Sequence, residues 1–389
     1  MKKCMILFLC VLVACEEVDR SEERTEAAVV PLEDVARMLS ALPIGTGQVG
    51  EVRDAVAASV ANGYDEEYMM ADLFRSPGSG VGDAATKAGP ARIYEAPLRD
   101  LIEAYAATAT KAGGPVPDLV ALRASDVQIY WPYSEQVDSD EELPVVTYDP
   151  GDGSTANVGY RRLPDGSVEE IIVDEEYARR HPVWVVNRND DSAYPSLELL
   201  RKLHPEWEGG GLVAVPSGAG RREGTKADEG KIRTLVLKSF AMKRQFDPWL
   251  AGASEFFVKL GAIDDFYAST EAELLLYQPQ ITDFMIVVRR IQIGQHLPLN
   301  AMLVSNWTEQ LTTCALMVTE DDGGTRTTWK TEGEVKIKSR TYGFSLSIPF
   351  TSRDDIVWRG NLSGKYFERY NSVSGRFGDV DLTFEILER

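Results

Sequence analysis

The sequence predicts a multidomain α+β chain, with an N-terminal helical region and a small antiparallel sheet followed by an antiparallel β-sandwich. Three observations lead to this prediction. Apolar residues recur with helical spacing from Pro31, and they alternate as in strands from Val127. A Gly-rich stretch over 208–230 then separates these regions from new strand-like runs that begin at Lys231. A mature chain of about 370 residues also exceeds one typical domain, so we expect two or three domains.

The first fifteen residues have the pattern of an export signal. A basic start is followed by an apolar run over 5–14, which is too short to span a bilayer. The run ends L-V-A-C at Cys15, and this resembles the lipobox, where the signal peptide is removed before a lipidated cysteine. The resemblance implies a signal peptide over 1–14 and an outer-membrane lipoprotein of the bacterial cell envelope, held to the membrane by a palmitate-type anchor on Cys15. The alternative is an ordinary cleavable signal in which this cysteine is accidental.

Residues 15–30 are predicted to be an acidic tether, because their many charges and few apolar side chains cannot form a core. Acidic residues directly after the lipidated cysteine resemble the surface-export signals of Bacteroidetes lipoproteins. A plain solvated linker explains them equally well. The membrane face therefore stays open. The layout of the whole chain also resembles that of Bacteroidetes-type lipoproteins, a resemblance that implies no particular activity.

Cysteine usage agrees with export. Cys4 and Cys10 leave with the predicted signal peptide, and Cys15 carries lipid, so Cys314 alone remains. An intramolecular disulfide is therefore not expected. Cys314 lies inside a strand-like run, where we expect a small buried hydrophobe rather than a nucleophile.

The region 31–125 is predicted to be helical. Its apolar residues fall on single helical faces, a pattern typical of core packing rather than ligand contact. We expect helices that start at Pro31, span 51–61, start at Asp65, and span 97–111.

The region 126–207 is predicted to be a small antiparallel sheet packed on these helices. Short apolar runs alternate with polar residues, and Asp165-Gly166 is a good hairpin turn. The polar run over 187–192 can in principle bind a cation, but we favour a turn. A short helix is expected over 197–207. Residues 208–230 are predicted to be a Gly-rich linker.

The C-terminal region, 231–389, is predicted to be a β-sandwich. Strand-like runs surround Leu235 and Val258, with turn residues at Asp247-Pro248 between them. Another buried run ends in E-D-D-G-G at 320–324. Further strands are expected over 284–293, 334–338, 342–349 and 380–386.

The three consecutive acids at 320–322 have two explanations. Like charges at a strand end repel one another, so their concentration needs a cause. A hard cation is one cause, because Ca²⁺ takes six to eight oxygen ligands and two loops at one end of a sandwich can converge on it. Solubility of a strongly acidic protein is the other.

Four segments of this region share sequence patterns with one known domain family. The segment G-A-S-E-F-F-V-K-L (252–260) resembles the G-x-S-D-P-Y-V-x-V element of C2 domains, and V-T-E-D-D-G (318–323) resembles their V-x-D-x-D loop. N-W-T-E (306–309) is similar to the family's W-N-E segment, and D-D-I-V-W-R-G (354–360) is faintly similar to its closing element. The resemblance implies a C2-like sandwich that binds Ca²⁺. The residues that it places in the calcium loops are Asp247, Glu255, Glu320 and Asp322. Here Glu255 and Glu320 stand where the family has Asp, and Phe256 replaces Pro.

Charge and motifs limit the function. With 61 acidic and 41 basic residues, the net charge of −20 argues against nucleic acid as a partner. The sequence lacks H-E-x-x-H, a Cys/His zinc spacing, a G-x-S-x-G elbow and a Walker A motif. We therefore expect a non-catalytic binding or adhesion protein with a protein or glycan ligand, calcium-dependent through its acidic loops. The alternative is a hydrolase of envelope or extracellular polymers, which requires two facing carboxylates. A purely structural role is the third possibility.

Overall fold

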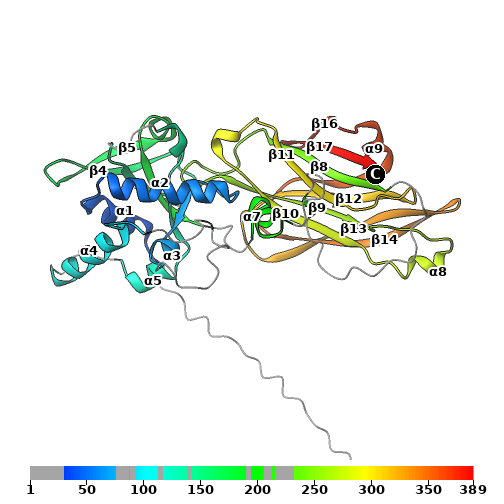
Figure 1. Ribbon diagram of the computed structural model, residues 1–389, viewed down its shortest axis with the longest axis horizontal. Coiled ribbons are helices and arrows are strands. Elements are labelled where there is room, and N and C mark those ends of the chain that lie inside the picture. Colours follow the sequence, from blue (N-terminus) through cyan, green and yellow to red (C-terminus); the bar gives the residue numbers. More distant parts are fainter. Residues whose placement is uncertain are drawn as a thin grey trace, which may run out of the picture.

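The structure is a computed structural model that describes residues 30–75, 87, 93–112, 117–137, 142–189, 194–205, 213–214 and 232–388. The predicted signal peptide, Cys15 and nearly all of the acidic tether lie outside these residues, as does most of the predicted linker. None of the helices within the described ranges is both long and apolar enough to cross a membrane. Figure 1 shows two units arranged along the long axis of the molecule. We call α1 to β6 (residues 30–189) the N-terminal unit and β7 to β17 (213–388) the C-terminal unit.

Helices of the N-terminal unit largely follow the prediction. Helix α1 (Leu32–Ala41) and helix α4 (Leu98–Ala112) lie where expected, while α2 (Thr46–Ala61) begins five residues before the predicted start. Helix α3 (Met70–Leu73) falls within the helix predicted from Asp65, whereas the short helix α5 (Leu119–Arg123) was not predicted.

The helix predicted to start at Asp65 is wrong in its first part. Residues Glu67–Met69 form strand β1, which pairs antiparallel with β2 (Val127–Tyr130). A contact with a residue distant in sequence explains why this segment is a strand and not a helix. The side chain of Glu67 is buried, and its carboxylate accepts a hydrogen bond at 2.8 Å from Asn189, which lies 122 residues away.

The sheet of the N-terminal unit is mixed, not wholly antiparallel as predicted. Its strand order is β1-β2-β6-β3-β4-β5, and β3 runs parallel to β6. Alternation of apolar residues shows which face of a strand is buried, but it does not show the direction of the neighbouring strand. The predicted turn at Asp165-Gly166 is confirmed, with Gly166 at φ +86° between β4 and β5. These strands are β3 (Val145–Tyr148), β4 (Ala156–Arg162), β5 (Val168–Asp174) and β6 (Val183–Arg188).

One core joins the helices to this sheet. Val35 and Leu39 of α1 and Val52 of α2 are fully buried with Trp131, which directly follows β2, and Trp184 of β6. The two tryptophan rings meet edge to face, with centroids 6.2 Å apart. The helical faces predicted to be core are therefore core.

The C-terminal unit consists of two sheets, antiparallel except for one short pair, and is consistent with a β-sandwich. One has the order β10-β9-β12-β13-β14, with β15 also paired to β12, and the other has the order β16-β17-β8-β11-β7. The first sheet contains β9 (Ser254–Ala262), β10 (Gln280–Val288), β12 (Leu311–Glu320), β13 (Arg326–Ile337), β14 (Arg340–Thr351) and β15 (Asp355–Ser363). The second contains β7 (Val213–Ala214), β8 (Arg233–Met242), β11 (Leu297–Val304), β16 (Ser374–Phe377) and β17 (Val380–Glu388).

Apolar side chains from both sheets form the core between them. Phe240 of β8 and Phe256 of β9 are fully buried, with ring centroids 4.9 Å apart. Cys314 is fully buried in the same core, as predicted, and burial raises the pKa of its thiol. Strand β7 lies inside the predicted linker and pairs parallel with β11. Strands β11 and β15 had not been predicted.

Four further α-helices lie within the described residues, and one of them, α8 (Glu271–Leu274), lies between β9 and β10 in sequence. Helix α6 (Glu175–Ala178) follows β5 in the N-terminal unit, and α9 (Gly364–Arg369) follows β15. Helix α7 (Leu197–Leu203), shorter than the predicted 197–207, lies between the two units and packs near β10 (Figure 1).

Candidate metal site at the junction of the two units

Strand register brings acidic residues from three strands to one end of the larger sheet. On β12, Glu320 lies opposite Phe256 of β9 and opposite Asp355 of β15. Glu255 is the neighbour of Phe256, and the backbone N–H of Asp321 donates to the carbonyl oxygen of Glu255 at 2.9 Å. Adjacent strands therefore hold Glu255, Glu320 and Asp355 at the same edge.

Two turns complete this edge. Gly323 and Gly324 have φ of +68° and +104°, values that favour glycine and allow the chain to reverse after Asp322. The hydroxyl of Thr351 donates to the carbonyl oxygen of Gly323 at 2.6 Å, which ties this turn to the turn before β15. The carboxylate of Asp354 accepts from the N–H of Thr351 at 2.9 Å and so shapes the second turn.

Five carboxylates converge there in two overlapping groups. One side-chain oxygen from each of Asp247, Glu255 and Glu320 lies within 4.8 Å of the other two, and the same holds for Glu320, Asp322 and Asp355. Two oxygens that bind one Ca²⁺ ion at about 2.4 Å lie no more than about 4.8 Å apart. Each group can therefore hold a metal ion, with Glu320 common to both.

Glu320 is the buried centre of this cluster. It is 1 % exposed, and its Oε1 has no hydrogen-bond partner among the residues that the structure describes. Burial, a hydrogen bond with Asp247, and the charges of Asp247, Asp322 and Asp355 raise the pKa of Glu320 to about 12. A buried oxygen acceptor without a donor is costly unless a cation or a proton satisfies it.

The remaining acids have less extreme environments. Burial raises the pKa of Asp247, and burial together with the charges of Asp247 and Asp355 raises the pKa of Asp322 to about 6. Asp322 and Asp355 are exposed, whereas Glu255 is buried. The cluster thus has a buried floor and a rim that is open to solvent, as entry of an ion requires.

All four acids predicted from the sequence meet in this cluster. Asp355 is the member that sequence reasoning missed, because a hairpin of β13 and β14 separates it from Asp322. That hairpin returns the chain to the same end of the sheet, so the long separation in sequence brings no separation in space. A useful signal was present in the acidic pair 354–355 directly before a strand-like run.

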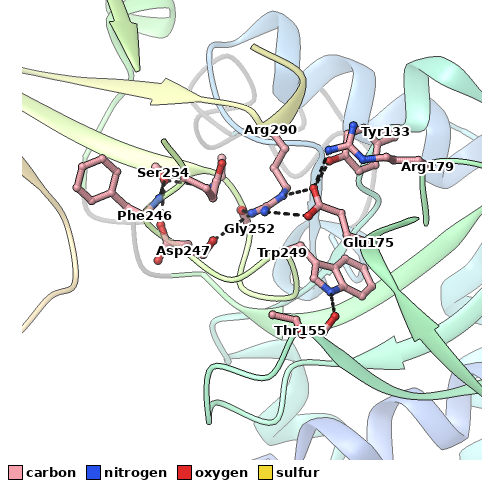
Figure 2. A network of polar contacts seen from close by, with 12 residues as sticks. Tyr133, Thr155, Glu175, Arg179, Phe246, Asp247, Trp249, Gly252, Ser254 and Arg290 are labelled. Carbon is pink, nitrogen blue, oxygen red and sulfur yellow. Dashed lines mark hydrogen bonds and ion pairs between the residues drawn. The ribbon is translucent and has the colours of Figure 1, made fainter. Parts of the chain in front are cut away.

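Asp247 lies in a loop that also contacts the N-terminal unit. This loop, residues 243–253 between β8 and β9, is here called the junction loop. The guanidinium of Arg290 donates to the carbonyl oxygens of Asp247 at 3.2 Å and Gly252 at 3.4 Å. It also pairs with Glu175 of α6 through Nε and Oε1 at 3.1 Å. Figure 2 shows Arg290 placed between the junction loop and Glu175.

Glu175 has further partners on the N-terminal unit. The Tyr133 hydroxyl donates to its carboxylate, and Arg179 pairs with it at 2.9 Å. Although burial raises the pKa of Glu175, the hydrogen bonds from Arg290 and Tyr133 lower it overall. A charged Glu175 is therefore the stable partner of Arg290.

The middle of the junction loop is buried in the N-terminal unit. Trp249 is 2 % exposed and donates from Nε1 to the carbonyl oxygen of Thr155 at 2.8 Å (Figure 2). The side-chain amide of Asn187 donates to the carbonyl oxygens of Leu250 at 3.1 Å and Ala251 at 2.5 Å. Sequence reasoning had predicted a turn in this segment but not this docking.

Two further contacts extend the junction. The N–H of Ala253 donates at 2.8 Å to Asp65, a buried residue whose pKa is raised by burial and by Glu66. Phe257 of β9 packs in a buried apolar cluster with Tyr64 of the N-terminal unit. The strand that carries Glu255 is therefore held against the N-terminal unit on one side.

Comparisons of this chain with known protein families, with curated proteins and with solved structures find no match.

Proposed function

We propose that this protein is a lipid-anchored, non-catalytic binding protein of the bacterial cell envelope whose C2-like sandwich holds Ca²⁺. The proposal combines the lipobox at Cys15 with the acidic cluster on the C-terminal unit. The observation that carries it is Glu320, a buried carboxyl group with an oxygen that lacks a donor among the described residues, surrounded by four other acids.

Ca²⁺ suits this cluster for two reasons. Its ligands are all oxygens, as a hard cation prefers, and their mutual distances fit the bond lengths of this ion. A positive ion also removes the repulsion that keeps Glu320 and Asp322 protonated far above their ordinary pKa values. The bound ion would bring together two loops at the end of the sandwich. Such a surface is suited to a protein or glycan ligand.

The hydrolase alternative finds weaker support in the same residues. A retaining glycosidase holds its two carboxyl groups about 5–5.5 Å apart across the bond to be cleaved. Oxygens of Glu320 and its neighbours lie within 4.8 Å, and Glu320 itself is almost fully covered. A carboxyl group covered in this way does not face a glycosidic bond from solvent, whereas these oxygen distances suit an ion.

Calorimetric titration of the chelator-treated full chain with Ca²⁺ tests the proposal. We expect saturable binding of Ca²⁺ and weaker binding of Mg²⁺, which demands a tighter octahedral site. Asp355→Asn should lower the Ca²⁺ affinity by at least about tenfold. Glu332→Gln is the control, because Glu332 is exposed on β13 and belongs to neither group of converging oxygens. Absence of binding by the unaltered chain would refute the proposal.

A further inference from the structure

The cation site and the junction between the two units share one short segment. Asp247 and Glu255 contribute carboxylates to the cluster, while Trp249 and Ala253, which lie between them in sequence, bind the N-terminal unit. Asp247 lies two residues before Trp249, and Glu255 lies two residues after Ala253, so a displacement of the docked residues also displaces the two carboxylates. The position of the metal ligands therefore depends on the docking of the loop.

Arg290 connects the backbone of Asp247, a residue of the acidic cluster, to the N-terminal unit through an ion pair. Arg290 is 8 % exposed and the Glu175 side chain is 30 % exposed, so the arginine end of the ion pair is shielded from water and the glutamate end is only partly shielded. The same guanidinium holds the carbonyl oxygen of Asp247, the residue whose side chain enters the cluster (Figure 2). Removal of the Glu175 charge would leave the buried Arg290 charge without its carboxylate partner in α6, which is costly.

A second link runs through β9. The hydroxyl of Ser254, which is fully buried, donates to the Asp247 carboxylate at 3.2 Å. Glu255 follows directly and pairs with Val287 of β10. Val287 and Phe257 belong to the apolar cluster that includes Tyr64 of the N-terminal unit. Contacts across the junction therefore fix the positions of both Asp247 and Glu255.

Glu320 gives an independent observation that points to a ligand. Its Oε1 is buried and has no donor among the described residues, and Glu320 lies on β12, opposite Phe256 of β9. An ion bound to Glu320, Asp247 and Glu255 would join β12 to both ends of the segment that contacts the N-terminal unit.

We propose that an ion in this cluster locks the two units in one orientation, and that docking of the N-terminal unit raises the affinity for the ion. The inference rests on the proposed function. Coupling between two sites is reciprocal, so a change on the N-terminal unit must alter ion binding and ion binding must stabilise the N-terminal side of the junction.

Hydrogen exchange of the unaltered full chain, with EGTA and with millimolar Ca²⁺, tests one direction. We expect Ca²⁺ to slow exchange in the junction loop and in the peptides 60–67 and 173–189, which carry Asp65, Glu175 and Asn187. Protection confined to the junction loop and residues 318–325 and 352–356 would overturn the coupling while leaving ion binding intact. A complete lack of protection and of binding would overturn the proposed function as well.

Glu175→Gln tests the other direction. The substitution removes the charge that Arg290 faces but does not alter any residue of the cluster. We expect the Ca²⁺ affinity to fall by about fivefold or more. Glu176→Gln is the matched control on the same helix, because Glu176 is exposed and pairs only with Arg180 among the described ion pairs. Equal Ca²⁺ affinities of the two variants would contradict the proposal.

Discussion

Arg290 of the C-terminal unit pairs with Glu175 of the N-terminal unit, with Nε and Oε1 3.1 Å apart. The same arginine holds the backbone of the junction loop at Asp247. One buried side chain therefore links the helix α6 of one unit to the acidic end of the sandwich in the other.

Glu320→Gln should abolish the stabilisation by Ca²⁺ and leave the unfolding temperature of the cation-free chain little changed. In the cation-free chain the pKa of Glu320 is about 12, so its carboxyl group is neutral at pH 7 and a neutral amide of the same shape replaces it. Thermal unfolding with and without Ca²⁺ measures both effects. The control is Glu332→Gln, an exposed position on β13. A full Ca²⁺ response of the Glu320→Gln variant would show that the ion binds elsewhere.

Binding of Ca²⁺ should release protons and strengthen as pH rises. The raised pKa values of Glu320 and Asp322 mean that the cation-free cluster holds protons which the ion must displace. Between about pH 5 and about pH 7, on either side of the Asp322 pKa, affinity should increase. Calorimetry in two buffers of different ionisation enthalpy counts the released protons. Binding that is independent of both buffer and pH would contradict the raised pKa values.

The stability of the cation-free fold should change with pH in the opposite direction to the Ca²⁺ affinity, and should fall as pH rises. A carboxyl group whose pKa is raised in the folded state stabilises the fold below its unfolded pKa, and this contribution is lost as pH rises through the folded value. For Asp322 the loss falls between about pH 4, the unfolded pKa, and its folded pKa of about 6. The cation-free chain should therefore lose stability over that window relative to Asp322→Asn. Urea unfolding of both proteins at several pH values gives the difference.

Trp249→Ala should destabilise the protein by about 3–5 kcal/mol, the range for removal of a buried large aromatic side chain. Trp249 is 2 % exposed and its indole N–H donates to Thr155 across the junction. Urea unfolding measures the loss. Trp329→Ala on the β13–β14 hairpin should cost less, because Trp329 is only partly buried. Equal losses of stability for the two variants would mean that docking of the junction loop contributes little to the free energy of unfolding.

Cys15→Ser should prevent lipid attachment and release the protein from membranes. The prediction depends on the lipobox motif L-V-A-C and the basic start of the chain. Metabolic labelling with a fatty acid in a bacterium that processes lipoproteins, followed by membrane fractionation, measures both. Continued labelling of the variant would place the lipid on another residue.

The strands and helices with strong periodicity could be predicted from the sequence. The faces of α1 and the buried runs of β9 and β12 follow the rule that apolar spacing matches the period of the element. The segment from Asp65 could not be predicted, because the buried acids there depend on partners such as Asn189 and Arg289, which are distant in sequence. Tertiary pairing overrides local preference in such a segment.

The candidate site was predictable in its composition but not in its setting. Glu320 and Asp322 stand out because like charges follow a buried strand, and Asp247 and Glu255 were identified through a resemblance. Asp355 was missed because no local pattern shows that a long hairpin returns to the same edge. The docking of Trp249 was equally hidden, since an apolar residue in a loop does not reveal which unit buries it.

Thermal unfolding of the full chain in EGTA and in millimolar Ca²⁺ tests the central claim most directly. If the carboxylates around Glu320 bind Ca²⁺ in the folded state, mass action raises the unfolding temperature by several degrees. Because the site contacts the junction, the rise should appear in the transitions of both units. An unfolding temperature that is the same in EGTA and in Ca²⁺ would contradict the account, and the five acids would then be a proton-sharing cluster without an ion.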